Sequence, residues 1–286
     1  MSKTRFIAPA QACDCHAHVF DRADPPSAET AAAYAVPDAP YAAYRAMLDS
    51  IGLTRGVLVQ PSAYADDHRV LLAALRHAEG RLAGIGLLDA GAHEGDFDVL
   101  AAGGVVGLRF VEARVPDSGA RFANSIGIDA LPDLCGAMAA RGWHAEIWAP
   151  LAQAAAICDD HAGRGVPIVL DHLAGAAAQT DPADPAFRAI VEHVRRGHVW
   201  VKLVLCRTAA TPDGYAAARP LHEALVAANP GRLLWGTDWP FLRKGQAAPA
   251  PSRLLDSLAD WTPDPRHLHA ILVTNPAAFY FRKDRS

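Results

Sequence analysis

Short runs of β-branched and aliphatic residues recur along this chain at intervals of roughly thirty residues, and a segment with helical periodicity follows each run. Such alternation is typical of parallel strands joined by crossover helices. The expected strands cover residues 13–16, 56–59, 83–86, 106–110, 145–148, 167–170, 199–203 and 233–236. Eight units fit a closed barrel better than an open doubly wound sheet. We therefore expect a TIM-type (β/α)8 barrel of the α/β class, formed as a single domain by residues 1–286.

The helical segments carry recognisable start and stop signals. Residues 67–79 open with acidic side chains, place aliphatic side chains along one face and end before Gly80. Residues 131–141 and 186–196 likewise end before a glycine. We expect these helices to pack on the outside of the barrel.

Composition and charge narrow the possible partners. With 51% hydrophobic and 20% charged residues, the chain can bury a sizeable core. A net charge of −4 gives no general attraction to nucleic acid or to an anionic membrane, and no apolar run is long enough to cross a bilayer. Residues 1–11 contain no apolar leader, and the five cysteines are widely spread, as expected of reduced thiols. We therefore expect a cytoplasmic protein that acts on a small molecule and has no nucleic-acid or membrane partner; the oligomeric state stays open.

Four ionisable side chains are expected to meet at one end of the barrel. The motif Asp14-Cys15-His16-Ala17-His18 ends the first expected strand, and alternation along a strand puts His16 and His18 on the same face. His172 follows the sixth strand and Asp238 follows the eighth. Because the carboxyl ends of barrel strands form one rim, distant positions become neighbours there.

At this point the chain resembles the amidohydrolase superfamily, whose pattern has His-x-His after strand one, His after strand six and Asp after strand eight. It looks closest to the branch that contains the 2-pyrone-4,6-dicarboxylate lactonases and related lactone hydrolases. The landmarks run from residue 13 to residue 276 and are Asp14-Cys15-His16-x-His18-Val19-Phe20, Val59-Gln60-x-Ser62, Gly107-Leu108-Arg109-Phe110, Asp171-His172, Trp235-Gly236-Thr237-Asp238-Trp239-Pro240 and Val273-Thr274-Asn275-Pro276.

The resemblance implies a hydrolase that opens the ester bond of a carboxylate-bearing lactone of the pyrone-dicarboxylate, muconolactone or sugar-acid type. Asp238 is then the general base that activates water, while His16, His18 and His172 orient the water and polarise the carbonyl group. The alternative is a metal-dependent decarboxylase of the same superfamily that acts on an aromatic or unsaturated carboxylic acid.

Guanidinium groups near these residues indicate an acidic substrate, because they bind carboxylates bidentately. Together with the resemblance, this gives the expected substrate-binding residues Tyr34, Ser62, Arg109, Arg114, Trp148 and Arg207. The family pattern has an arginine three residues after the histidine of strand six, whereas here Leu173-Ala174-Gly175 follows His172. One carboxylate clamp is therefore missing, and the choice among lactones stays open.

The need for a metal is the main open point of mechanism. His16, His18 and Asp238 are also a ligand set for a divalent ion such as Zn2+. Binuclear relatives add a Lys or Glu from strand four and a His from strand five, but these strands offer Arg109 and Glu146 here. A guanidinium beside the site disfavours a cation. We therefore expect hydrolysis that requires no cofactor, with one divalent metal as the alternative.

Overall fold

Eight parallel strands form one sheet in the order β1 to β8 in the computed structural model, which describes residues 4–27, 34–115, 118–163 and 165–282. The strands are β1 (Cys13–Ala17), β2 (Arg55–Val59), β3 (Leu82–Gly86), β4 (Val105–Val111), β5 (His144–Trp148), β6 (Ile168–Leu170), β7 (Val199–Leu203) and β8 (Leu233–Trp235). Every strand predicted from the sequence is therefore present, with ends that differ by at most one residue.

The ends of the sheet meet where β1 approaches the segment after β8. Ala17 forms a parallel bridge with Trp239, and the Asp238 backbone N–H donates a hydrogen bond to the His16 carbonyl at 2.9 Å. The sheet is thus a nearly closed barrel, which confirms the expected (β/α)8 architecture.

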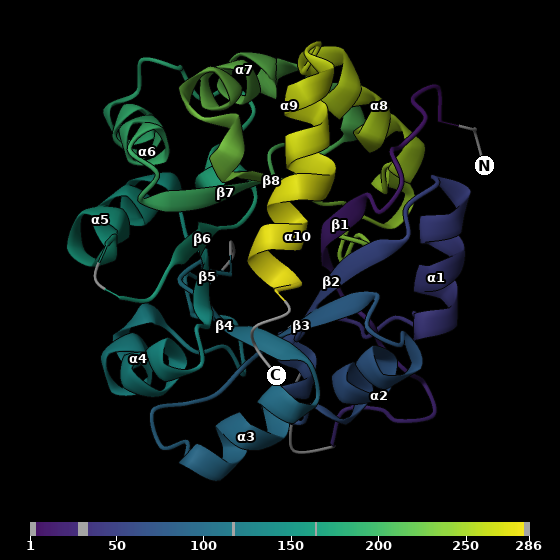
Figure 1. The fold of residues 1–286 in the computed structure, drawn as a ribbon, viewed down its shortest axis with the longest axis vertical. Helices are drawn as coiled ribbons and strands as arrows, with labels where there is room; N and C mark the ends of the chain where they lie inside the picture. Colours follow the sequence, from purple (N-terminus) through teal and green to yellow (C-terminus); the bar gives the residue numbers. More distant parts are fainter. Residues whose placement is uncertain (1–3, 28–33, 116–117, 164, 283–286) are drawn as a thin grey trace.

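Helices surround this barrel (Figure 1). They are α1 (Tyr41–Ser50), α2 (Arg69–His77), α3 (Glu94–Ala102), α4 (Leu131–Ala140), α5 (Leu151–His161), α6 (Pro185–Arg195), α7 (Arg219–Ala228), α8 (Pro251–Trp261), α9 (Pro265–His269) and α10 (Asn275–Tyr280). Helix α2 ends at His77 with Ala78 as its C-cap. Gly80, the predicted stop signal, follows two residues after the C-cap and has φ +80°. No helix in the described part of the chain has the length and apolar character needed to span a membrane.

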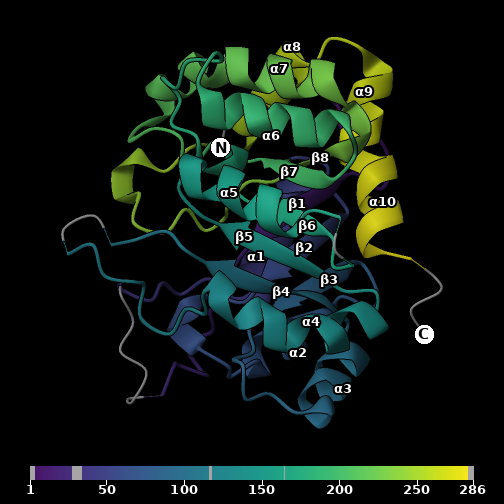
Figure 2. The same ribbon diagram turned by 90° about the vertical axis from the view of Figure 1, so that its left-hand side faces the viewer.

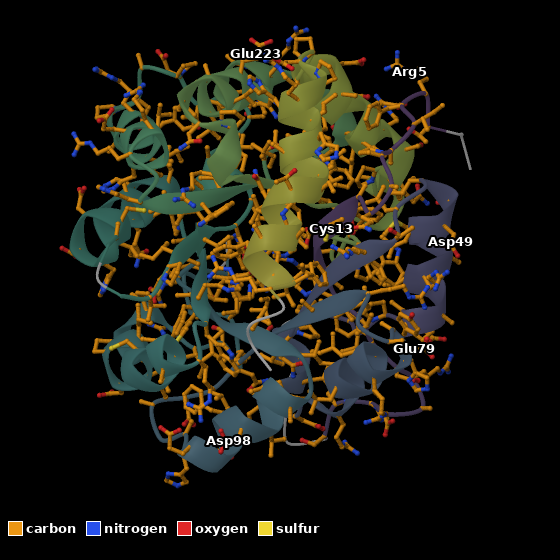
Figure 3. The ribbon with its side chains drawn as sticks, viewed as in Figure 1. Arg5, Cys13, Asp49, Glu79, Asp98 and Glu223 are labelled. Atoms are coloured by element: carbon orange, nitrogen blue, oxygen red, sulfur yellow. The ribbon has the colours of Figure 1, made fainter. Side chains whose placement is uncertain are left out.

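The core has two layers. The outer layer lies between barrel and helices and includes Leu108 of β4 and Met138 of α4. The inner layer fills the barrel with β-branched side chains such as Val57 and Val169. Charged residues labelled in Figure 3, such as Arg5 and Glu223, lie at the periphery of the molecule, whereas the buried Cys13 lies near its centre.

Helix α10 closes the end of the barrel at which the strands begin. Phe279 and Tyr280 belong to the inner layer, and their rings lie 4.7 and 5.3 Å from the ring of His144, the first residue of β5. In the side view, α10 lies on one side of the barrel, and the loops after β1 and β4 extend on the other (Figure 2). The open end of the barrel is therefore the end at which the strands finish.

Candidate active site

The segment after β8 is hydrogen-bonded to β1 through the buried carboxylate of Asp14. Asp14 accepts hydrogen bonds from the Thr237 backbone N–H at 2.9 Å and from the Thr237 hydroxyl at 2.7 Å. A Cβ atom on Gly236 would lie 2.7 Å from the His16 Cβ atom, so only glycine permits this approach. This contact holds Asp238 directly beside the two histidines of β1.

Three imidazoles surround one oxygen of Asp238. Its Oδ1 atom lies 3.5 Å from His18 Nε2, 3.7 Å from His172 Nε2 and 3.8 Å from His16 Nε2. Its Oδ2 atom forms an ion pair with Arg207 Nε at 2.7 Å. Asp238 and His172 also share left-handed backbone angles, with φ of 63° and 50°, which are unfavourable for residues other than glycine. The four predicted catalytic residues therefore converge, although their roles stay predictions.

The surroundings of these groups set their protonation. Burial alone would raise the pKa of Asp238, but the Arg207 guanidinium and the adjacent histidines hold it well below its usual range. Burial lowers the pKa of His16 to about 3 and also lowers that of His172. An anionic carboxylate and neutral imidazoles are the forms that bind a divalent ion.

Contacts at Nδ1 orient the rings of His18 and His16 so that their Nε2 atoms face Asp238. His18 Nδ1 lies 2.8 Å from the Val59 carbonyl oxygen, which can only accept, so this nitrogen carries the proton. His16 Nδ1 lies 3.2 Å from Asp171 Oδ1. His18 therefore presents its Nε2 lone pair to a metal. His16 Nδ1 also lies 3.2 Å from the Lys202 ammonium, so its contact with Asp171 orients the ring without fixing its tautomer.

A cleft opens above this cluster at the carboxyl ends of the strands. It is lined by His18, Tyr34, Pro61, Ser62, Arg109, Phe122, Trp148, His172, Arg207, Asp238, Leu242 and Arg243. Most of the predicted site residues thus face one cleft. His16 lies beneath it, fully buried. Arg114 is half-exposed, pairs with Glu112 at 3.7 Å and lines an adjoining hollow.

The arginines of the cleft differ in what they bind. Arg109 pairs with Asp171 at 3.3 Å and lies over the Trp148 ring, while Arg207 pairs with Asp238. Arg243 lies over the Phe122 ring at 5.0 Å and makes no ion pair with a residue that the structure describes. Arg243 was not predicted from the sequence, because a lone arginine in a long loop carries no spacing signal.

A buried network of charges lies below the cluster. Lys202 Nζ is 2.6 Å from Glu146 Oε2, 3.3 Å from Asp171 Oδ1 and 3.2 Å from His16 Nδ1. Although burial opposes it, the two carboxylates raise the pKa of Lys202 above its usual value. Lys202 was also missed, although one charged residue in the apolar run Val199–Leu203 was a usable signal.

Comparison with known proteins places this geometry in context. The amidohydrolase family model matches residues 13–282. The chain is 28% identical to 4-sulfomuconolactone hydrolase of Hydrogenophaga intermedia, over 96% of this chain and 90% of that protein. It is 27% identical to 2-pyrone-4,6-dicarboxylate hydrolase of Comamonas testosteroni, over 99% of this chain and 94% of that protein. A solved structure, a proposed 2-pyrone-4,6-dicarboxylic acid hydrolase of Pseudomonas putida, shares 29% identity and a TM-score of 0.81, covering 95% of this chain and 97% of that one.

The prediction that no cofactor is required was wrong. His16, His172 and Asp238 each offer a ligand atom, and these atoms lie within 4.8 Å of one another. The buried atoms His16 Nε2, His172 Nε2 and Asp238 Oδ1 have no hydrogen-bond partner in the described part of the chain, which fits a site built for an ion. An amidohydrolase of Burkholderia multivorans with this fold was crystallised with bound zinc, at 19% identity and a TM-score of 0.69, covering 95% of this chain and 99% of that one.

The guanidinium groups beside the site do not exclude a cation, for an electrostatic reason. We expected their positive charge to repel a metal ion. In the structure, Arg109 and Arg207 are each paired with a buried carboxylate, Asp171 and Asp238. Their positive charge is thus largely neutralised within the protein.

Proposed function

This chain belongs to the amidohydrolase family, and we propose that it hydrolyses the ester bond of a lactone that carries acidic groups. One observation supports this most: the Asp238 carboxylate, ringed by three imidazoles, opens into a cleft lined by Arg109, Arg207 and Arg243. The relatives named above act on 4-sulfomuconolactone and 2-pyrone-4,6-dicarboxylate, so both names specify lactones with acidic groups.

We further propose that His16, His172 and Asp238, with His18 beside them, hold one divalent ion such as zinc. When bound, such an ion polarises a carbonyl oxygen and lowers the pKa of a coordinated water. The chain orients its own groups for this: Val59 and Asp171 fix the His18 and His16 rings through Nδ1.

Asp238 is proposed as the general base. It is anionic near pH 7 because Arg207 and the histidines outweigh the effect of burial, so it can accept a proton from the attacking water. Water adds to the carbonyl carbon, the carbonyl oxygen becomes an oxyanion, and the ester C–O bond then breaks. The proton held by Asp238 passes to the leaving alkoxide oxygen, which yields the ring-opened hydroxy acid or its keto form.

The acidic groups of the substrate are proposed to bind the guanidiniums above the cluster. Arg109 Nε is buried and has no hydrogen-bond partner among the described residues, although its Nη2 atom pairs with Asp171. Arg243 makes no ion pair with the residues that the structure describes, and its contact with the Phe122 ring holds it over the cleft. Arg243 thus takes the role of the clamp that the sequence lacks after His172, with Tyr34 and Ser62 as proposed hydrogen-bonding groups.

The test is proton release in weakly buffered indicator solution. Zinc-loaded protein is given pyrone carboxylates, muconolactones and aldonolactones, and the product mass is measured. We expect the product to gain one water, and Asp238→Asn, which keeps the side-chain shape, to abolish release. Loss of carbon dioxide from an aromatic acid instead would refute the proposal in favour of a decarboxylase, an activity that the names of the two lactone hydrolases above do not support.

Three expectations stay predictions: a cytoplasmic location, a single domain over residues 1–286, and the absence of nucleic-acid or membrane partners.

A further inference from the structure

Beneath the proposed metal site lies a second group of ligand atoms that surrounds Lys202. His16, Glu146 and Asp171 each offer an atom, and these atoms lie within 4.8 Å of one another. All three side chains are fully buried. This group shares His16 with the first group, so the two cation positions would be adjacent.

The ammonium of Lys202 already lies among these ligand atoms. Its Nζ atom is within 3.3 Å of an atom from each of the three side chains, as given above. His16 Nε2 faces Asp238, whereas its Nδ1 faces Asp171 and Lys202. One imidazole thus separates the proposed metal from the ammonium.

The buried charges around Lys202 sum to zero only when its ammonium is included. Glu146 and Asp171 bring two buried carboxylates, and Lys202 and Arg109 bring two cations. Glu146 Oε1 is bound by the Tyr280 hydroxyl at 3.1 Å and lies 3.3 Å from His144 Nε2, so Oε2 is the oxygen left for a cation. Removing the ammonium would leave buried, uncompensated negative charge, which strongly favours any cation that can replace it.

We propose that Lys202 is a built-in cation that fills a second cation position, so that the chain binds one divalent ion rather than two. Lys202 is therefore a positioning residue: it holds Glu146 and Asp171 in place and leaves Asp171 to orient His16. An ion that replaced the ammonium would bind the two carboxylates and, after loss of the ring proton, His16 Nδ1.

Counting metal ions tests this role directly. Wild type and Lys202→Ala are saturated with zinc, freed of unbound zinc by gel filtration and measured by elemental analysis as zinc per chain. We expect Lys202→Ala to hold one zinc more than wild type, and Lys202→Ala/Glu146→Gln to lose that extra ion. If Lys202 had only a structural role, replacing it would not change the number of zinc ions per chain. Equal counts in wild type and Lys202→Ala, or two ions in wild type, would overturn the proposal.

The inference rests on the metal site of the proposed function, but the experiment separates the two. If wild type binds no zinc, the metal proposed above fails, while an ion gained by Lys202→Ala alone still supports the role of Lys202. If Lys202→Ala unfolds without metal, it is refolded with zinc. We then expect zinc to raise its melting temperature more than that of wild type, and an equal rise in both would count against the proposal.

Discussion

Replacing Arg243 with Met should selectively weaken the reaction of substrates that carry a second acidic group. Arg243 makes no ion pair with a described residue, so Arg243→Met leaves no carboxylate of the protein without its partner. Methionine keeps the unbranched stem and its contact with Phe122. The change in activity should therefore report the contact with the substrate alone.

The expected size follows from the surroundings of the guanidinium. A hydrogen bond to a charged group contributes about 1.5–3 kcal/mol, and because Arg243 is exposed to solvent we expect the lower half of that range. About 1.5–2 kcal/mol corresponds to a loss of about 10- to 30-fold in kcat/KM.

The assay compares a lactone with two free acidic groups and its monomethyl ester, using proton release. The loss should appear for the free diacid and largely disappear for the ester that lacks the relevant charge. The matched control is Lys244→Met, which removes a cation from the same loop, where Lys244 binds the Ala209 carbonyl at 2.7 Å; we expect less than about a fivefold loss there. Equal losses for diacid and ester, or equal losses in the two variants, would refute the assignment of Arg243.

Three further predictions follow from the site and the core. Prolonged treatment with a strong chelator should abolish turnover and zinc should restore it; full activity in protein shown by elemental analysis to be metal-free would contradict the proposed ion. Gly236→Ala should cost roughly 1–3 kcal/mol in the free energy of unfolding and most of the activity, because the new Cβ meets His16; unchanged urea midpoints and rates would show that the contact relaxes freely. Burial lowers the pKa of His222, which lies 2.7 Å from the Thr262 hydroxyl, to about 4. Below about pH 6.5 the unfolded chain therefore binds a proton that the folded chain excludes, so the free energy of unfolding should fall by up to roughly 3 kcal/mol as pH drops from 6.5 to 4. Urea titrations should show a flatter pH dependence in His222→Gln, and identical slopes would contradict this.

Local sequence patterns were sufficient to predict the barrel and the convergence of its histidines. All strands of a (β/α)8 barrel end at one rim. The position of His172 directly after a strand is therefore enough to predict that it lies near Asp238. The partners of a charge, in contrast, depend on contacts distant in sequence. Arg109 is neutralised by Asp171 and Arg207 by Asp238, and the sequence contains no local sign of either pairing. The wrong conclusion about the metal came from this missing information.

The end of the barrel at which the strands begin is closed by α10, and this implies the order in which a metal ion and a substrate bind. Because α10 covers that end and His16 is fully buried beneath the cleft, an ion would reach its ligands through the cleft that we propose for the substrate. A bound substrate or product would then lie above the ion and slow its escape. We therefore expect the ion to bind before the substrate, and a chelator to remove it more slowly from protein that holds a slowly reacting lactone than from free protein.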